Sequence, residues 1–299
     1  MLKAFQMKTL LFAVLTFLSL SFSSCSIDDG FKGKLILSIT DSPLDADAVK
    51  GVNLVLTNIE IKKKDQWKSL KAFDQPQGIN LLAYADGKSF PIVDQLVEPG
   101  TFSEIRFSLN VSNGSALIRN PLSNIEFTDG TTQVMLLPEA TAPEFVISKE
   151  ISIEPNQILD LTLDVDVRKS ILKNSQNQYI FVPSFRLLST FETGNIGGKI
   201  LNLAESDRVV VFAYISGQYN SGETSGVDGI RFKNSITASK VKKGKFTTAF
   251  LEAGTYDLVF VKQTKTGEFI GVAGVERSIS LKAKDQLQLE IDINKLTGS

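Results

Sequence analysis

Apolar and polar residues alternate with a period of two along most of the chain, and this pattern predicts β-strands. In "QLQLEIDI" near the C-terminus, Leu287, Leu289, Ile291 and Ile293 alternate with polar residues. A strand with this pattern buries one face and exposes the other. The same alternation occurs in "GKLILSIT", "GVNLVLTNIEIKK", "TFSEIRFSLN", "ILDLTLDVDV", "YIFVPSFRLL", "RVVVFAYI" and "TYDLVFVKQ".

Turn signals separate these segments, among them "DSP", "EPGT", "SNGS", "TDGT", "KKGK" and "EAGT". The best helical candidate, "RKSILKN", is short, and no amphipathic helical run exceeds about three turns. We therefore predict an all-β protein made of two antiparallel β-sandwich domains in tandem.

A change in composition at "LSTFETGNIGG", where threonine and glycine collect, predicts the boundary between the two domains. The predicted organisation is a signal peptide at 1–24, a lipidated tether at 25–32, a β-rich domain of unknown function at 33–189, a linker at 190–197 and a second sandwich at 198–299.

The N-terminus has the pattern of a signal peptide. Lys3 and Lys8 precede an uncharged apolar run at 10–22, which is shorter than the ~20 residues that a membrane-spanning helix needs. Small residues then precede Cys25, the only cysteine. This segment resembles the lipobox of bacterial lipoproteins, which implies cleavage before Cys25 and its diacylation. The alternative is an ordinary secreted protein whose leader ends near a free cysteine.

Asp28 and Asp29 follow the cysteine closely. In some Gram-negative lineages a short acidic cluster at this place resembles a tag for export to the outer face of the outer membrane. The alternative is a flexible, solvated tether. We expect a lipid anchor in the outer membrane at the cell surface, with the leaflet left open.

Composition narrows the chemistry that the mature protein can perform. Removal of residues 1–24 takes away Lys3 and Lys8 and no acid, which leaves 30 basic and 33 acidic residues and a net charge of −3. This near-neutral balance argues against a nucleic-acid partner. Histidine is absent from the sequence, and no second cysteine is present, which removes nucleophile–histidine pairs and most zinc sites. Carboxylate, lysine and hydroxyl chemistry remain.

Each half resembles a known family. The first half looks like an uncharacterised family of β-rich lipoprotein domains of unknown function, on Gly33, Asp41, Pro43, Gly100, Ile105, Arg106, Asp164, Asp166, Ser170 and Pro183. The second half is similar to transthyretin-like, carboxypeptidase-regulatory-type sandwiches, on Gly198, Gly244, Phe246, Leu251, Gly254, Tyr256 and Leu258. The first resemblance implies an envelope location without an assigned reaction, and the second implies a spacer or a support for binding.

The strongest polar pattern is "LDLTLDVDVRKS". In a strand, Asp160, Asp164 and Asp166 point to one face, where oxygen ligands of this kind suit calcium. The alternative is a solvent-facing acidic stripe relieved by Arg168 and Lys169. In a second acidic group, "DSPLDAD", we expect Asp41 to form a turn rather than to bind a metal ion.

Trp67 lies in "KKKDQWKSL" near an expected hairpin. Its ring can stack on a glycan, or it can pack across the hairpin against neighbouring side chains. The lysines around it are most simply a solvated or edge-protecting cluster.

These observations favour a cell-envelope lipoprotein that is a surface-exposed, non-enzymatic binding or adhesion module. We expect no cofactor apart from possible calcium, attachment to the membrane through the N-terminal lipid, and a glycan or protein partner. One alternative is a periplasm-facing structural component of an envelope complex. Another is a carboxylate-dependent glycan hydrolase, although its paired carboxylates must flank a cleft.

Overall fold

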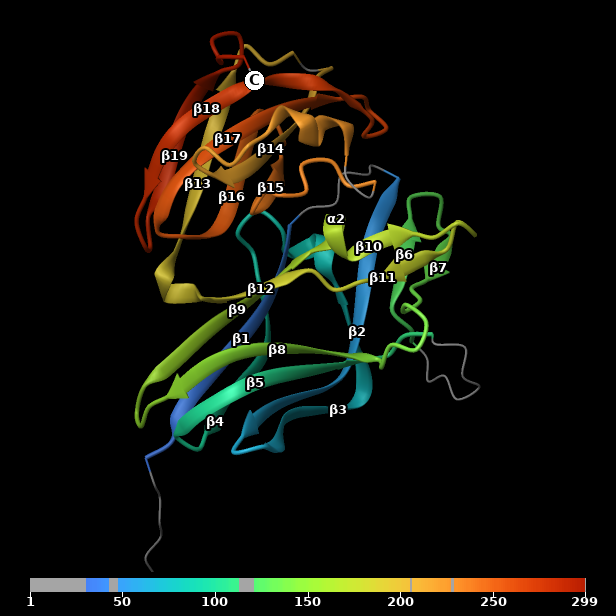
Figure 1. Ribbon diagram of the computed structural model, residues 1–299, viewed down its shortest axis with the longest axis vertical. Helices are drawn as coiled ribbons and strands as arrows, with labels where there is room; N and C mark the ends of the chain where they lie inside the picture. The colour runs from blue at the N-terminus through green and yellow to red at the C-terminus, as the bar shows by residue number, and fades with distance from the viewer. Residues whose placement is uncertain (1–30, 43–47, 113–120, 205, 227–228, 299) are drawn as a thin grey trace, which may run out of the picture.

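The computed structural model describes residues 31–42, 48–112, 121–204, 206–226 and 229–298 (Figure 1). Cys25, Asp28 and Asp29 lie outside the described residues. The strands of the N-terminal half are β1 (Gly33–Ser42), β2 (Val49–Lys63), β3 (Gln66–Asn80), β4 (Phe90–Val97), β5 (Gly100–Leu109), β6 (Asn124–Phe127), β7 (Thr132–Val134), β8 (Glu144–Ile153), β9 (Ile158–Asp166), β10 (Ile171–Lys173), β11 (Tyr179–Phe181) and β12 (Phe185–Ser189).

The C-terminal half contains β13 (Thr193–Leu201), β14 (Arg208–Ile215), β15 (Thr237–Lys240), β16 (Lys245–Glu252), β17 (Gly254–Gln263), β18 (Phe269–Leu281) and β19 (Gln286–Asp292). Within the described residues, the helical segments are four short turns, η1 (Leu81–Tyr84), α2 (Val167–Ser170), η2 (Thr190–Glu192) and η3 (Ser221–Ser225). The predicted all-β fold is confirmed.

Two sheets enclose the core of the N-terminal half. One has the order β12-β9-β1-β4, and the other has the order β7-β6-β2-β5-β8 with β3 paired to β2. Alternation in β1 places Leu35, Leu37 and Ile39 in the core, where all three are almost fully buried. The parallel register of β1 and β9 sets Leu37 beside Leu161. The other strand pairs described in this sandwich are antiparallel, and the β1–β9 pair brings distant segments together at its centre.

The C-terminal half repeats this plan with its own core. A sheet of order β16-β13-β19 packs on a sheet of order β15-β14-β17-β18. Ile196, Leu258 and Phe260 lie in the apolar cluster between the sheets. Here too one pair, β13 with β19, is parallel. Strand β13 runs so close to β19 at Gly198 that a side chain would not fit there. A Cβ on Gly198 would lie 2.6 Å from the carbonyl oxygen of Leu289.

The predicted strands match the structure except at "YIFVPSFRLL". This segment forms two strands, β11 and β12, which belong to different sheets. Pro183 lies between them and has no N–H to continue a ladder. The short helical candidate "RKSILKN" is helical only at "RKS", in α2, which follows β9 directly. Its next three residues form strand β10, so this part of the prediction is wrong.

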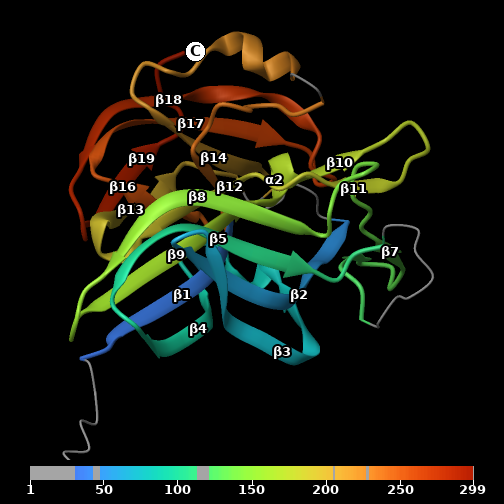
Figure 2. The ribbon, with the colours of Figure 1, turned by 60° about the horizontal axis from the view of Figure 1, so that its bottom comes forward.

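The two halves are stacked along the long axis of the molecule (Figure 1). Strand β1 starts at the end remote from the C-terminal half and runs toward the junction, and Figure 2 shows the same arrangement from another side. Among the described residues, no helix has the length and apolar character needed to span a bilayer.

The expected linker at 190–197 contains η2 and the first residues of β13. The core clusters of the two halves draw on separate parts of the chain, from Leu35 to Leu187 and from Ile196 to Ile293. The division into two independent domains stays a prediction.

We expect a fragment of residues 190–299, which keeps β13 whole, to fold alone, because a sandwich of about 110 residues can bury its own core. Its thermal unfolding, followed by circular dichroism, should be cooperative and reversible. A broad, non-cooperative loss of signal would mean that the halves share one folding unit.

Candidate functional site

The acidic end of β9 lies where the two halves meet. Asp164 and Asp166 are only 4% and 6% exposed. The interpretation of these residues as a solvent-facing stripe is therefore wrong. Ser235 and Ile236 of the C-terminal half lie with both carboxylates around one cavity, so this face of the sheet is covered by the other half. Sequence alternation alone does not show what covers a face.

Asp164 is paired with a cation on the neighbouring strand. Arg186 of β12 lies directly opposite Asp164 in the antiparallel register. Its guanidinium donates through Nε and Nη2 to the same carboxylate oxygen, with Nε at 3.1 Å. Burial raises the pKa of Asp164, and Arg186 opposes this effect.

Asp166 is held by the two cations of α2, which begins at the next residue. One oxygen of its carboxylate, Oδ2, lies 2.9 Å from Arg168 Nη2 and 3.1 Å from Lys169 Nζ. The chain turns out of β9 into this helix, so the cations fold back onto the residue that precedes them. Burial lowers the pKa of Lys169, while Asp166 raises it.

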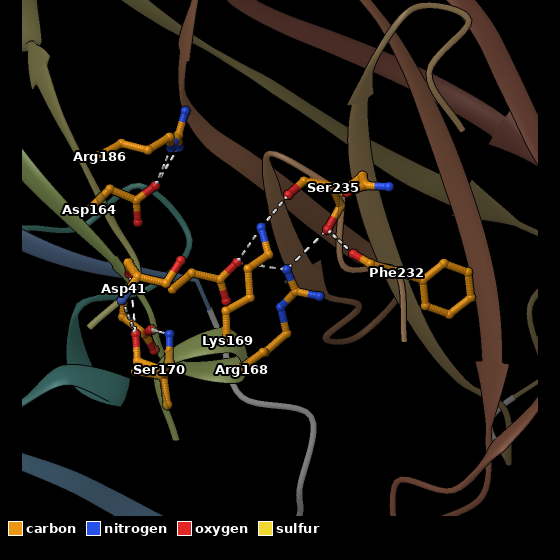
Figure 3. Close-up of polar contacts among 12 residues, drawn as sticks. Asp41, Asp164, Arg168, Lys169, Ser170, Arg186, Phe232 and Ser235 are labelled. Atoms are coloured by element: carbon orange, nitrogen blue, oxygen red, sulfur yellow. Dashed lines mark hydrogen bonds and ion pairs between the residues drawn. The ribbon is translucent and has the colours of Figure 1, made fainter. Parts of the chain in front are cut away.

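The same two cations reach across to the C-terminal half (Figure 3). Arg168 donates to the hydroxyl of Ser235 at 3.0 Å, and Lys169 donates to the backbone carbonyl of Ser235 at 2.7 Å. The Ser235 hydroxyl donates in turn to the carbonyl of Phe232 at 2.7 Å. The Arg168 guanidinium also lies 5.0 Å from the ring centre of Phe212. We name Asp164, Asp166, Arg168, Lys169, Arg186 and Ser235 the seam cluster.

Asp41 extends this cluster from the end of β1. Asp41 Oδ1 accepts from the backbone N–H of Val167, just after the neighbouring strand β9, at 3.3 Å. The turn-forming role expected for Asp41 stays a prediction, because residues 43–47 lie outside the described part of the chain. Asp41 Oδ2 is buried and makes no hydrogen bond within the described part of the chain. Burial raises the pKa of Asp41 well above its usual value, and the nearby Asp164 and Asp166 add to this.

Asp160 lies apart from the other two acids of β9. Its carboxylate accepts from the Thr190 hydroxyl at 2.9 Å, and Thr190 also lies 2.8 Å from the Thr162 hydroxyl. The described residues contain no group of three or more acidic or thiol side chains arranged to hold a metal ion. Calcium at Asp160, Asp164 and Asp166 stays a prediction.

A cavity of about 230 Å³ opens beside Asp164, Asp166 and Lys169. Both carboxylates that line it are bound to cations on their own half. Two of these cations, Arg168 and Lys169, also contact Ser235 of the C-terminal half and so join two surfaces. Acid–base chemistry needs instead a carboxyl whose proton can reach a substrate. The geometry therefore favours a structural clamp over a pair of catalytic acids.

A second contact between the halves involves Asp86, which follows η1. Its carboxylate accepts from the Ser239 hydroxyl at 3.1 Å and lies 2.6 Å from Lys242 Nζ. Sequence reasoning found neither this residue nor Ser235. Both are polar residues in loops without a recognisable motif, and only the packing of the halves reveals them.

Trp67 lies on the outer face of the N-terminal half, far along the chain from the seam cluster. The Arg106 guanidinium lies 4.2 Å from the centre of its ring and is paired with Glu60 at 2.7 Å. Lys62, the strand partner of Trp67, lies 5.7 Å from the ring centre. The ring is half-buried beneath these cations, of which Lys62 lies across the hairpin and Arg106 lies in β5, on the other side of β2. A role of Trp67 in ligand binding stays a prediction.

Comparison with known families and structures gives one assignment for the N-terminal half. The family described as Domain of unknown function (DUF4382) matches residues 32–183. No curated protein matches the chain.

Three solved structures illustrate the structural similarity. The Bacillus anthracis TIE protein is 9% identical with a TM-score of 0.22, covering 87% of this chain and 33% of that one. A leucine-rich repeat protein from Bacteroides thetaiotaomicron is 13% identical with a TM-score of 0.21, covering 88% and 26%. The chain thus spans a third or less of these two proteins. The fimbrial anchor protein Mfa2 from Porphyromonas gingivalis is 12% identical with a TM-score of 0.18, covering 78% and 83%.

Replacing Arg168 with methionine should destabilise the protein by about 2–3 kcal/mol, because it removes one of the two cations that hold the buried Asp166 carboxylate. Urea unfolding measures the change. Lys34→Met is the matched control, since Lys34 pairs with Asp94 at the surface and such a pair contributes about 0–1 kcal/mol. Equal effects of the two substitutions would contradict the clamp.

Replacing Asp41 with asparagine should raise the melting temperature at pH 7.5 and change it little near pH 4. The raised pKa means that folded Asp41 retains a proton which the unfolded chain releases, so its contribution to stability is lost as pH rises through the folded pKa. Asparagine has no charge to bury and keeps an oxygen for Val167. Asp65→Asn, at a fully exposed side chain, serves as the control. A lower melting temperature for Asp41→Asn at pH 7.5 would refute this assignment.

Proposed function

The chain belongs to the DUF4382 family, and from this premise we propose that it is a lipid-anchored, surface-exposed binding or adhesion module without catalytic activity. The proposal depends on one observation, which is that the three acidic side chains of β9 are bound to other groups of the protein. Asp164 and Asp166 are bound to cations in the seam cluster, and Asp160 is bound to a threonine hydroxyl. Acids bound in this way, with the cations of Asp166 also contacting Ser235 of the other sandwich, fit a structural role better than a catalytic one.

The direction of the chain supports an anchor at one end. Strand β1 begins at the end remote from the C-terminal half (Figure 1), and the segment before it leads back to Cys25. Lipidation there would attach the N-terminal sandwich to the membrane and hold the other sandwich farther out. In this proposal Asp28 and Asp29 direct export to the cell surface, and the C-terminal half is a transthyretin-like support.

The anchor is tested by replacing Cys25 with alanine. We expect the wild type to incorporate labelled fatty acid and to fractionate with the outer membrane, and the variant to lose both properties. Ser26→Ala, next to the acceptor, is the matched control and should keep them. Because Cys25 is the only cysteine, label retained by the variant would exclude lipidation of a thiol and overturn the anchor.

Protease added to intact cells separates the surface location from the periplasm-facing alternative. The wild type should be cut, and Asp28→Ala/Asp29→Ala should be protected if the acidic pair is the export tag. Protection of the wild type would support the periplasm-facing component instead.

A further inference from the structure

The C-terminal half carries a basic groove that the seam cluster does not use. Two hollows, of about 370 and 200 Å³, lie next to each other and share Gln263 and Gly267 in their walls. The first is bordered by Arg208, Lys240, Lys242 and Lys243, and the second by Arg168 and Arg231. We name the two hollows together the basic groove.

Strand register explains how the groove forms. Arg208 of β14 lies opposite Gln263 of β17, and Val210 lies opposite Lys240 of β15. Residues at alternate positions of β14 share a face, so Arg208 and Val210 lie on the face that carries Phe212. Phe232, from the loop after η3, stacks on Phe212 with ring centres 4.4 Å apart. This loop covers the Phe212 end of the face, and the Arg208 end stays open.

The N-terminal half completes the groove. Figure 1 shows α2 beside β14 and β15, and Arg168 from α2 lines the second hollow above Phe212. At the other hollow, Lys242 is paired with Asp86 of the N-terminal half. The seam cluster thus fixes the position of one cation of the groove, and the Asp86 contact fixes another.

The charged side chains that line the groove are all cations, and two of them, Arg168 and Lys242, are paired with Asp166 and Asp86 behind the lining. Six cations line the two hollows, and among the described lining residues none is acidic. Arg208 and Lys243 are exposed, so they can bind an incoming group without a large desolvation cost. Asp207, the neighbour of Arg208, is directed to Lys262 at 3.7 Å. Because the mature chain has a net charge of −3, this groove is a local reversal of its overall charge.

The uncharged side chains in the wall of the groove indicate which kind of anionic ligand it can bind. Gln263 and Thr264 lie in the wall. The Thr264 hydroxyl lies 2.8 Å from the Thr266 hydroxyl and accepts from the Glu268 N–H at 3.0 Å, so the Gln263 amide is the group that can bind a hydroxyl. Phe232 is fully buried, and Phe269 lies 5.2 Å beneath the Arg231 guanidinium, so these rings do not form an open platform for stacked bases. Spaced negative charges with hydroxyls between them are the chemistry of an acidic sugar chain.

We propose that the basic groove binds a segment of acidic polysaccharide through its carboxylate or sulfate groups. This inference rests on the proposed binding function and names its ligand class. Arginine and lysine bind such anions by charge-assisted hydrogen bonds. Salt weakens attraction between exposed charges, so binding weakens as ionic strength rises.

The test uses full-length protein purified in mild detergent, with immobilised polygalacturonate and neutral dextran as probes. The wild type should bind polygalacturonate and not dextran. Arg208→Glu/Lys243→Glu should weaken binding at least about tenfold, because it reverses two charges at the ligand. Lys199→Glu/Lys282→Glu, which makes the same change in net charge at exposed positions outside the groove, should change it less than about twofold. Melting curves verify that both variants fold.

Three outcomes would overturn the groove assignment. These are no binding to polygalacturonate, equal loss in the two double variants, or tighter groove-dependent binding of single-stranded DNA of matched charge. The assay uses purified protein and does not depend on the anchor. Binding without lipidation would therefore refute only the envelope proposal, and lipidation without binding would refute only the groove.

Discussion

The structure depends on the burial of the acidic end of β9 between two sandwiches. Buried carboxylates are costly unless they are paired, and Asp164 and Asp166 are paired with Arg186, Arg168 and Lys169. Two of these cations also bind Ser235 in the other half. The two cations that offset the charge of Asp166 thus also join the halves, which couples neutralisation of this carboxylate to packing of the sandwiches.

Local patterns in the sequence predicted strands such as β1, β2, β9 and β19, because a period of two follows from the geometry of a single strand. Others, such as β4, β8 and β18, were not among the predicted segments. The acidic face of β9 was visible in its alternation. The burial of this acidic face could not be predicted from the alternation. It depends on the register that sets Arg186 opposite Asp164 and on a loop from the C-terminal half of the chain. Asp41 shows the same limit, since its partner Val167 is 126 residues away in sequence.

The distribution of charge suits a binding protein. Acids of β9 are used inside the molecule, and the cations Arg208 and Lys243 are exposed in the basic groove. Both halves contribute to the groove. The side chain of Arg168, from α2 of the N-terminal half, lines the groove and is also paired with Asp166. Fixing the two sandwiches against each other therefore preorganises the groove, which reduces the conformational cost of binding.

The central claim is that Arg168 and Ser235 couple the two halves, and a double-mutant cycle tests it most directly. Urea unfolding of the wild type, Arg168→Met, Ser235→Ala and the double variant gives the interaction free energy of the pair. A hydrogen bond from a charged donor in a buried site predicts a coupling of about 1.5–3 kcal/mol. Additivity within about 0.5 kcal/mol would contradict the claim.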